Sequence, residues 1–135
     1  MNGSDSWRND PYVQSHPQTA AFWEAAADGR FLLPRCDACH RFHWYPRPFC
    51  PHCHGDSVQW VAGSGRGQVH AASRLHRKSG AYVVAYVQLD EGPIMLTNLL
   101  DCELADAPIG RAVRVVFRPA PEGRMLPMFV PLDGA

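Results

Sequence analysis

The sequence lacks any long apolar run. No stretch approaches the about 18 consecutive apolar residues that a membrane-spanning helix requires. The N-terminal segment MNGSDSWRNDPYVQSHPQ is polar and contains no apolar core of the kind that marks a secretory signal. These absences predict a cytoplasmic protein without membrane contact. In that compartment, the five cysteines are expected to be metal ligands or free thiols rather than disulfides.

An excess of charge of either sign is also absent, because 13 Lys and Arg residues balance 13 Asp and Glu residues. Proteins that bind nucleic acids generally show a basic excess, since much of their affinity comes from displacing counterions from phosphates. The neutral balance argues against a general nucleic-acid binder and leaves room only for a local basic patch.

A recognisable catalytic set is missing as well. The sequence has no serine in a nucleophile elbow, and GSGRGQV (63–69) lacks the Lys-Ser/Thr of a phosphate-binding loop and precedes a strand rather than a helix. Cys102 is flanked by Asp101 and Glu103, which raise the pKa of a thiol, so we interpret it as a bystander and not as a nucleophile. The chain is therefore not expected to be an enzyme by itself.

What the sequence does contain is a dense cysteine cluster. Two C-x-x-C pairs, Cys36 with Cys39 and Cys50 with Cys53, are separated by ten residues. Each pair forms a tight turn that directs two sulfurs at one ion, and together they complete a tetrahedral site. Because four sulfurs leave no open coordination position, we predict one structural zinc ion. Rubredoxin-like iron is the competing hypothesis, since CPHCHG is similar to the second cysteine turn of such electron carriers.

Histidines and aromatic residues fill the space between the cysteines. We expect the histidines to be exposed or hydrogen-bonded to the thiolates: His40, His43, His52 and His54. A ribbon hairpin has too small a core to bury the aromatic residues Phe42, Trp44, Tyr45 and Phe49. Some are expected to pack on the rest of the chain, and others to meet a partner chain.

The segments around the cluster predict four regions. They are a flexible arm (1–14), an N-terminal helical segment (15–33), the zinc ribbon (34–56) and a barrel (57–135). The helix is expected within TAAFWEAAAD, and about five strands with short turns follow Val58. The tail MLPMFVPL has too many prolines for a central strand and is expected at an edge. The predicted fold class is mainly β: an N-terminal helix, a rubredoxin-like zinc ribbon and a five-stranded OB-fold barrel.

The clearest strand is AYVVAYVQLD, in which Tyr82, Val84 and Tyr86 face one way and the residues between them the other. The two tyrosines could form a stacking platform for single-stranded nucleic acid, although packing in the core or across strands is the simpler role. A modestly basic stretch covers the preceding long strand, GSGRGQVHAASRLHR, and its turn: Arg66, His70, Arg74, His76, Arg77 and Lys78. Solvated charge explains it most simply, and a site for a phosphorylated ligand is the alternative.

Taken in order, several segments resemble one family, the zinc-ribbon plus OB-fold proteins that associate with thiolases and act on acyl-CoA. The similar segments are FWEAAADGRFLLPRCDAC, FHWYPRPFCPHC, VQWVAGSGRGQV, YVVAYVQLDEGPIMLTNLLD and IGRAVRVVFRP. They cover roughly residues 20 to 131, and all four ribbon cysteines are present. Their order and spacing are more specific than either cysteine pair alone.

This resemblance implies a non-catalytic accessory subunit of a complex in lipid metabolism. The partner would be a thiolase-like or lipid-transfer-type thiolase, an aldolase, an acyltransferase, or a hot-dog-fold enoyl-CoA hydratase, and the barrel would help to bind or channel the coenzyme A moiety. From residue chemistry we choose Arg47, Phe49, Arg66 and Arg74 as coenzyme A contacts. Phe42, Trp44 and Tyr45 are our candidates for the partner interface. The alternative function is a single-stranded nucleic-acid-binding OB-fold protein.

Overall fold

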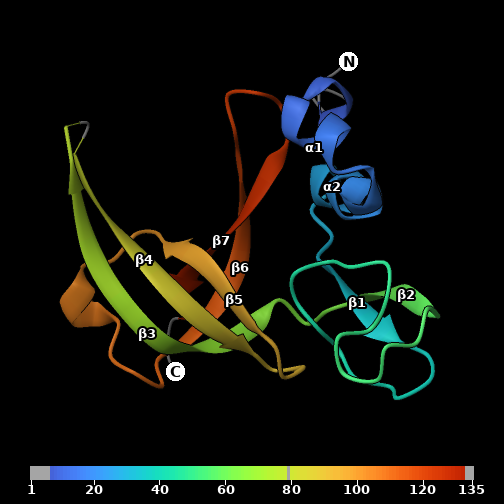
Figure 1. Ribbon diagram of the computed structural model, residues 1–135. Coiled ribbons are helices and arrows are strands. Elements are labelled where there is room, and N and C mark those ends of the chain that lie inside the picture. The colour runs from blue at the N-terminus through green and yellow to red at the C-terminus, as the bar shows by residue number, and fades with distance from the viewer. Residues whose placement is uncertain (1–6, 79, 133–135) are drawn as a thin grey trace. The chain divides into compact units, whose positions relative to one another are not determined.

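The computed structural model describes residues 7–78 and 80–132 of the chain (Figure 1). The chain folds into two compact units. The first, which we call the ribbon unit, comprises residues 1–63 and 117–127, and the second, the barrel unit, comprises residues 64–116 and 128–135. The two units are interleaved in sequence, because the turn end of the last β-hairpin, residues 117–127, belongs to the ribbon unit.

The ribbon unit begins with short helices: α1 (Pro11–Ser15), the 3-10 helix η2 (Pro17–Thr19) and α2 (Ala20–Ala27). Asp10 caps α1 by accepting a hydrogen bond from the Tyr12 N–H at 2.8 Å. Helix α2 turns Phe22 and Trp23 inward, as its apolar side predicts. Among the described residues, no helix has the length and apolar character needed to cross a bilayer.

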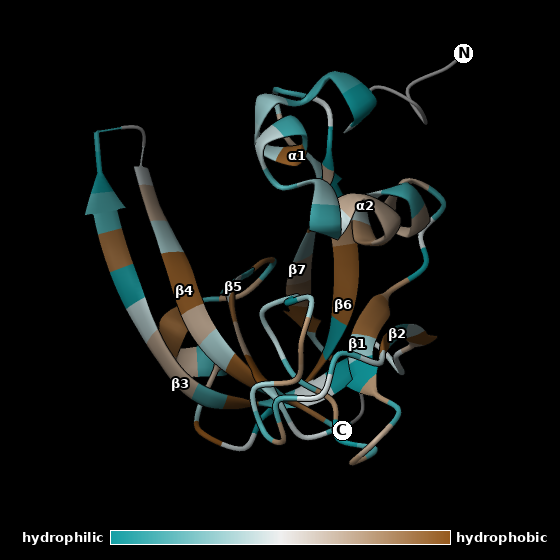
Figure 2. Ribbon diagram, turned by 45° about the vertical axis from the view of Figure 1, so that its right-hand side comes forward, coloured by the Kyte–Doolittle hydropathy of each residue, from teal (hydrophilic) through white to brown (hydrophobic). Residues whose placement is uncertain are grey.

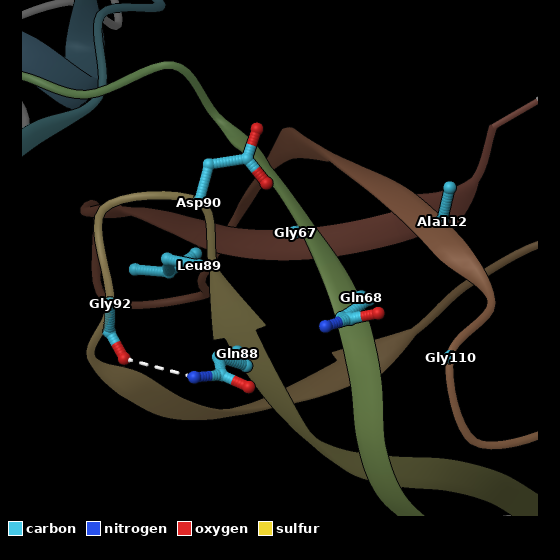
Figure 3. Close-up of a pocket in the computed structure, with 8 residues that line it drawn as sticks. All are labelled: Gly67, Gln68, Gln88, Leu89, Asp90, Gly92, Gly110 and Ala112. Atoms are coloured by element: carbon cyan, nitrogen blue, oxygen red, sulfur yellow. Dashed lines mark hydrogen bonds between the residues drawn. The ribbon is translucent and has the colours of Figure 1, made fainter.

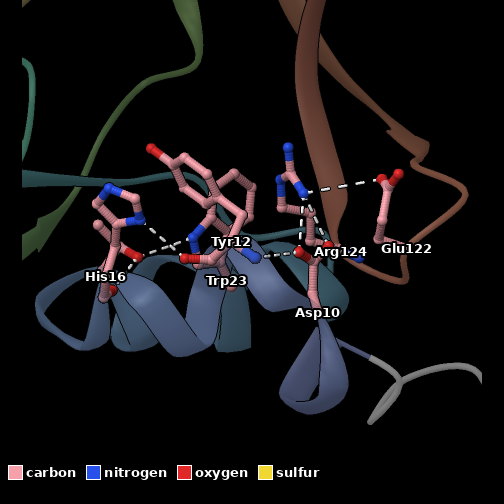
Figure 4. A network of polar contacts seen from close by, with 7 residues as sticks. Asp10, Tyr12, His16, Trp23, Glu122 and Arg124 are labelled. Atoms are coloured by element: carbon pink, nitrogen blue, oxygen red, sulfur yellow. Dashed lines mark hydrogen bonds and ion pairs between the residues drawn. The ribbon is translucent and has the colours of Figure 1, made fainter.

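The predicted flexible arm is wrong for residues 7–14. Trp7, Asp10 and Val13 are at most 5% exposed, and α1 begins at Pro11. The physical reason is the ion pair between Asp10 and Arg124, which holds this segment against the hairpin that carries Arg124 (Figure 4). Residues 1–6 of the predicted arm lie outside the described residues.

A two-stranded antiparallel sheet forms the base of the ribbon. Strand β1 (Leu32–Cys36) pairs with β2 (Val58–Ala62), with Leu32 opposite Ala62 and Cys36 opposite Val58. We expected this strand to be the first strand of the barrel, within 57–135. That expectation is wrong, because β2 pairs with β1. The short pattern SVQWVAG is compatible with a strand of the ribbon sheet and with a strand of the barrel. The pairing of β1 with β2 is extended by one hydrogen bond, in which the Gly63 N–H donates to the Phe31 carbonyl at 2.8 Å.

The barrel unit contains the closed five-stranded barrel, as predicted. Its strands are β3 (Arg66–Arg77), β4 (Gly80–Leu89), β5 (Ile94–Leu99), β6 (Ala112–Pro119) and β7 (Met125–Pro131), in the spatial order β3-β4-β5-β7-β6 (Figure 1). The barrel closes between β3 and β6, where Gly67 pairs with Val113. A register shift between Val69 and Ala71 marks a β-bulge in β3. This strand order is that of an OB-fold.

The predicted alternation along β4 is present, and it places Val83, Ala85, Val87 and Leu89 in the barrel core. A core role for the two tyrosines on the other face is wrong, because Tyr82 and Tyr86 are exposed. The hydropathy colouring shows how apolar this strand is (Figure 2). The prediction that the proline-rich tail lies at an edge is wrong, because β7 lies between β5 and β6. Its prolines are tolerated there because β5 and β7 pair at a single position, Leu99 with Phe129.

Candidate metal centre and surrounding surfaces

The four cysteines of the two C-x-x-C pairs meet at one point. Their Sγ atoms all lie within 4.8 Å of one another, and both the Cys36–Cys53 and the Cys39–Cys50 sulfur pairs are 3.6 Å apart. A tetrahedral ion with metal–sulfur bonds of about 2.3 Å requires sulfurs about 3.8 Å apart. The sequence prediction of one four-sulfur site therefore fits the geometry.

The backbone around the cysteines repeats itself. In the first turn the His40 N–H donates to the Cys36 carbonyl at 2.8 Å, and in the second the His54 N–H donates to the Cys50 carbonyl at 2.9 Å. Both histidines adopt left-handed backbone conformations, with φ of 65° and 67°. These two equivalent turns direct the sulfurs of each pair toward the common centre.

The pKa values of the clustered cysteines are shifted in opposite directions. Burial raises the pKa of Cys50, but hydrogen bonds from the backbone N–H groups of Cys53 and His52 outweigh it and lower the pKa to about 6. At Cys53, the Gly55 backbone lowers the pKa, yet the neighbouring cysteine sulfurs raise it to about 11. Four contacting sulfurs do not all ionise by themselves, whereas a bound dication stabilises all four thiolates.

The histidines of the ribbon do not behave alike. His43 is 4% exposed, and neither ring nitrogen has a hydrogen-bond partner in the structure. Burial lowers its pKa, and the nearby charges of His52 and Arg47 lower it further. Our expectation of an exposed or thiolate-bonded ring is therefore wrong for His43.

The aromatic residues of the ribbon differ in exposure. Trp44 packs on Phe22 with ring centroids 5.2 Å apart. The hydroxyl groups of Tyr45 and Tyr12 form a hydrogen bond. The pKa of Tyr45 is raised, mainly by burial and in addition by this hydrogen bond. Both are half-buried within the ribbon unit, as is Phe42. Phe49 is the exposed one, at 46%.

The four residues chosen as coenzyme A contacts are all exposed, and they divide between the units. Arg47 and Phe49 belong to the ribbon unit, whereas Arg66 and Arg74 belong to β3 in the barrel unit. Arg66 is the first residue of β3, and Arg74 lies eight residues further along the strand. The structure therefore does not gather these four side chains at one site within either unit.

A hollow that the sequence did not predict lies on the barrel unit. Its volume is ≈ 470 Å³, and its polar side chains are Gln68, Gln88 and Asp90 (Figure 3). The Gln88 amide donates to the Gly92 carbonyl at 3.5 Å. Gln68 and Gln88 are cross-strand partners on β3 and β4, so strand pairing brings together two amides that are 20 residues apart.

Cys102 lines a smaller hollow of ≈ 280 Å³, together with Asp106 and Arg111. Burial raises the pKa of this thiol, and Asp106 adds to the effect while Arg111 opposes it. A thiol with a raised pKa is a poor nucleophile at neutral pH. This agrees with the prediction of a bystander.

Two family models match the chain in succession. The rubredoxin-like zinc ribbon domain of ChsH2 matches residues 23–59, and the C-terminal OB-fold domain of ChsH2 matches residues 60–118. A solved structure of an Ltp2-ChsH2(DUF35) aldolase superposes with a TM-score of 0.74 and 34% identity, covering 84% of this chain and 93% of that one. The zinc ribbon and OB-fold expectations are thereby confirmed.

Curated relatives give the same picture. The chain is 36% identical, over 82% of its length, to a probable enoyl-CoA hydratase alpha subunit of Thermomonospora curvata, but spans only 37% of that protein. It is 32% identical, over 62% of its length, to a DUF35 domain-containing scaffold protein of Methanocaldococcus jannaschii and spans 64% of it. With both domains matched in order, the chain belongs to the ChsH2 and DUF35 family of zinc-ribbon and OB-fold proteins.

Proposed function

We propose that this chain is a non-catalytic accessory subunit of a thiolase-like enzyme that acts on acyl-CoA. The observation that carries the proposal is the two-domain match to the ChsH2 chain of an Ltp2-ChsH2(DUF35) aldolase, which covers nearly all of that chain. A relative named as a scaffold protein supports the same role. The partner would supply the catalytic groups, and this chain would stabilise the partner.

The chemistry of the described side chains supports a non-catalytic role. Four sulfurs around one ion leave no position for a water molecule or a substrate, so the bound ion would not activate either of them. The raised pKa of the remaining cysteine, Cys102, makes it a weak nucleophile. The hydratase relative does not contradict this role, because two thirds of that protein lie outside the match.

The ion we propose is one zinc, held by Cys36, Cys39, Cys50 and Cys53. Zinc with four thiolates has no redox chemistry and contributes binding energy to folding. Its role would be to fix the ribbon, and with it the half-buried aromatic residues Phe42, Trp44 and Tyr45, which we retain as candidates for the partner interface.

Contacts with coenzyme A remain part of the proposal. Exposed arginines can fork onto phosphate oxygens, and Arg47, Arg66 and Arg74 are all exposed. Phe49, 46% exposed, offers a ring surface for the adenine or the pantetheine arm. Because the residues divide between the two units, we expect the partner enzyme to form most of the coenzyme A site, with this chain contributing one or two contacts.

A tagged capture from the native host tests the function. We expect a thiolase-fold, aldolase or hydratase subunit to co-purify in near-equal amount and to lose activity or solubility when produced without this chain. If the enzyme subunit without this chain has the same activity and the same substrate range as the complex, the accessory role is contradicted. Capture of single-strand-binding proteins or nucleic acid, with no such enzyme, would contradict the proposal as a whole.

The alternative function is binding of single-stranded nucleic acid, and the exposure of Tyr82 and Tyr86 is the observation that favours it. The neutral charge balance of the chain counts against it. Beside the tyrosines, Arg77 donates to the Tyr82 hydroxyl, whereas Arg74 pairs with Val83 on the opposite face of the strand pair. A salt-dependent affinity for oligonucleotides would favour the alternative.

A further inference from the structure

One face of the barrel unit is apolar although solvent reaches it. Strand pairing sets Leu75 opposite Tyr82 on β3 and β4, and Tyr86 opposite Leu96 on β4 and β5. On β4 and β5 the intervening residues Val83, Ala85 and Met95 are buried, so the tyrosines and Leu96 point outward. Leu75 shares this face because it pairs with Tyr82. We call the following set the outer face: Leu75, Tyr82, Val84, Tyr86, Ile94 and Leu96. Tyr86 is 49% exposed and Leu96 is 60% exposed.

The composition of the outer face points to a protein partner. Single exposed apolar residues are ordinary, but a contiguous group of them on adjacent strands marks an interaction surface. All six side chains are uncharged. At the Leu75–Tyr82 end of the outer face, Arg77 donates a hydrogen bond to the Tyr82 hydroxyl at 3.2 Å. A surface with an uncharged centre and two tyrosines resembles the centre of a protein–protein interface, where aromatic anchors carry most of the affinity.

The outer face continues into the hollow beside it. Gln88 is the next outward residue of β4 after Tyr86, and it pairs with Ile94 on one side and with Gln68 on the other. Beyond it lies Asp90, which is exposed and has no ion-pair partner among the described residues (Figure 3). The hollow therefore offers one carboxylate and two amide oxygens, an arrangement of acceptors that suits a guanidinium or ammonium group.

We propose that the outer face and the hollow together receive the enzyme subunit of the proposed function, on which this inference rests. The partner presents an apolar patch to Tyr86 and Leu96 and inserts an arginine or lysine between Gln68, Gln88 and Asp90. The carboxylate gives the charge complementarity that orients the partner, and the apolar residues give the affinity.

Titration calorimetry with the enzyme subunit identified in the capture experiment tests this inference. The double variant Tyr86→Glu/Leu96→Glu is expected to weaken binding about 30-fold or more, as loss of an interface anchor does. Asp90→Asn is expected to weaken binding about tenfold and to reduce its dependence on salt. Leu104→Glu is the matched control, because Leu104 is 39% exposed but lies on the 3-10 helix η3 (Leu104–Asp106) outside the three strands.

Each outcome decides the inference. Weaker binding by the face variants, with thermal midpoints equal to wild type and the control unchanged, supports it. Equal binding by all variants overturns the inference while the accessory function stands. Absence of any enzyme partner overturns both. A stable dimer of the chain alone that Tyr86→Glu dissociates, measured by sedimentation, assigns the face to a second copy and also overturns the inference.

Discussion

Asp10 and Arg124, 114 residues apart, form a buried ion pair in the ribbon unit (Figure 4). Arg124 Nη1 lies 2.9 Å from Asp10 Oδ1 and 2.8 Å from Oδ2, and the Arg124 N–H donates to Oδ2 at 3.3 Å. The guanidinium also lies 4.6 Å from the centre of the Tyr12 ring and 5.5 Å from that of Trp23. The carboxylate is thus fully satisfied where water does not reach it.

Removing one partner of this pair should strongly destabilise the ribbon unit. We expect Asp10→Ala to lower the free energy of unfolding by about 3 kcal/mol, because it removes the buried carboxylate and leaves Arg124 with only the more distant and more exposed Glu122, at 3.9 Å. All four tryptophans lie in the ribbon unit, so urea unfolding followed by tryptophan fluorescence reports on it alone. Glu24→Ala is the control, since the Arg8–Glu24 pair is exposed and should cost less than about 1 kcal/mol.

The contribution of Asp10 should also depend on pH. Burial raises the pKa of Asp10, but hydrogen bonds from Arg124 and from the Tyr12 backbone outweigh it, so the pKa in the folded state is below its usual value. Its stabilisation is therefore complete above the unfolded pKa of about 3.9 and is lost as pH falls through the lower folded value. We expect the stability difference between wild type and Asp10→Asn to shrink from pH 7 to pH 3. A difference that is constant over this range would contradict the ion pair.

Local pattern predicted much of this fold. The alternation in AYVVAYVQLD identified β4 and its two faces, and the two C-x-x-C pairs identified the four cysteines that cluster, because both signals lie within one or two short segments. Pairing between distant segments was less accessible. Nothing near Asp10 indicates that Arg124 will neutralise it, so a polar N-terminus resembled a solvated arm.

The surfaces were harder to predict than the core. Sequence shows that Tyr82 and Tyr86 share one face of a strand, but only the register with β5 shows that Leu96 adjoins Tyr86 and extends the apolar area. The hollow beside it likewise depends on the pairing of Gln68 with Gln88. Such sites arise from cross-strand neighbours, which depend on turn geometry and register and do not show in the pattern of one strand alone.

Gly67 should be sensitive to any side chain. A Cβ at this position would lie 2.4 Å from the Gln88 carbonyl oxygen and 2.9 Å from Val87, and the backbone contact leaves it nowhere to move. We expect Gly67→Ala to destabilise the barrel unit by about 2 kcal/mol or more and to disturb pairing of β3 with β4. Loss of amide protection on β4 in hydrogen exchange would show this directly. Gln68→Ala, at the neighbouring exposed position, should change protection little.

Thr19 joins η2 to α2 through its hydroxyl. The Oγ1 atom donates to the His16 carbonyl at 2.7 Å and accepts from Trp23 Nε1 at 3.0 Å, and the side chain is 1% exposed. Thr19→Val keeps the shape but leaves the indole N–H without a partner, so we expect a loss of about 1–3 kcal/mol by tryptophan-detected unfolding. Thr19→Ser retains the hydroxyl and should cost less than Thr19→Val. The reverse order would mean that methyl packing outweighs the hydrogen bonds.

The metal centre gives the final prediction. We expect one zinc per chain by elemental analysis of the colourless wild-type protein, and a red, iron-containing protein would instead support the rubredoxin-like hypothesis. Cys50→Ser should lose the metal and abolish the tryptophan-detected transition, because metal binding supplies much of the folding energy of a small ribbon. Cys102→Ser, which alters the cysteine outside the four-sulfur cluster, should leave metal content unchanged. Since thiolates are the ligands, acidification should release the metal and unfold the ribbon unit together, and a chelator should do the same at neutral pH.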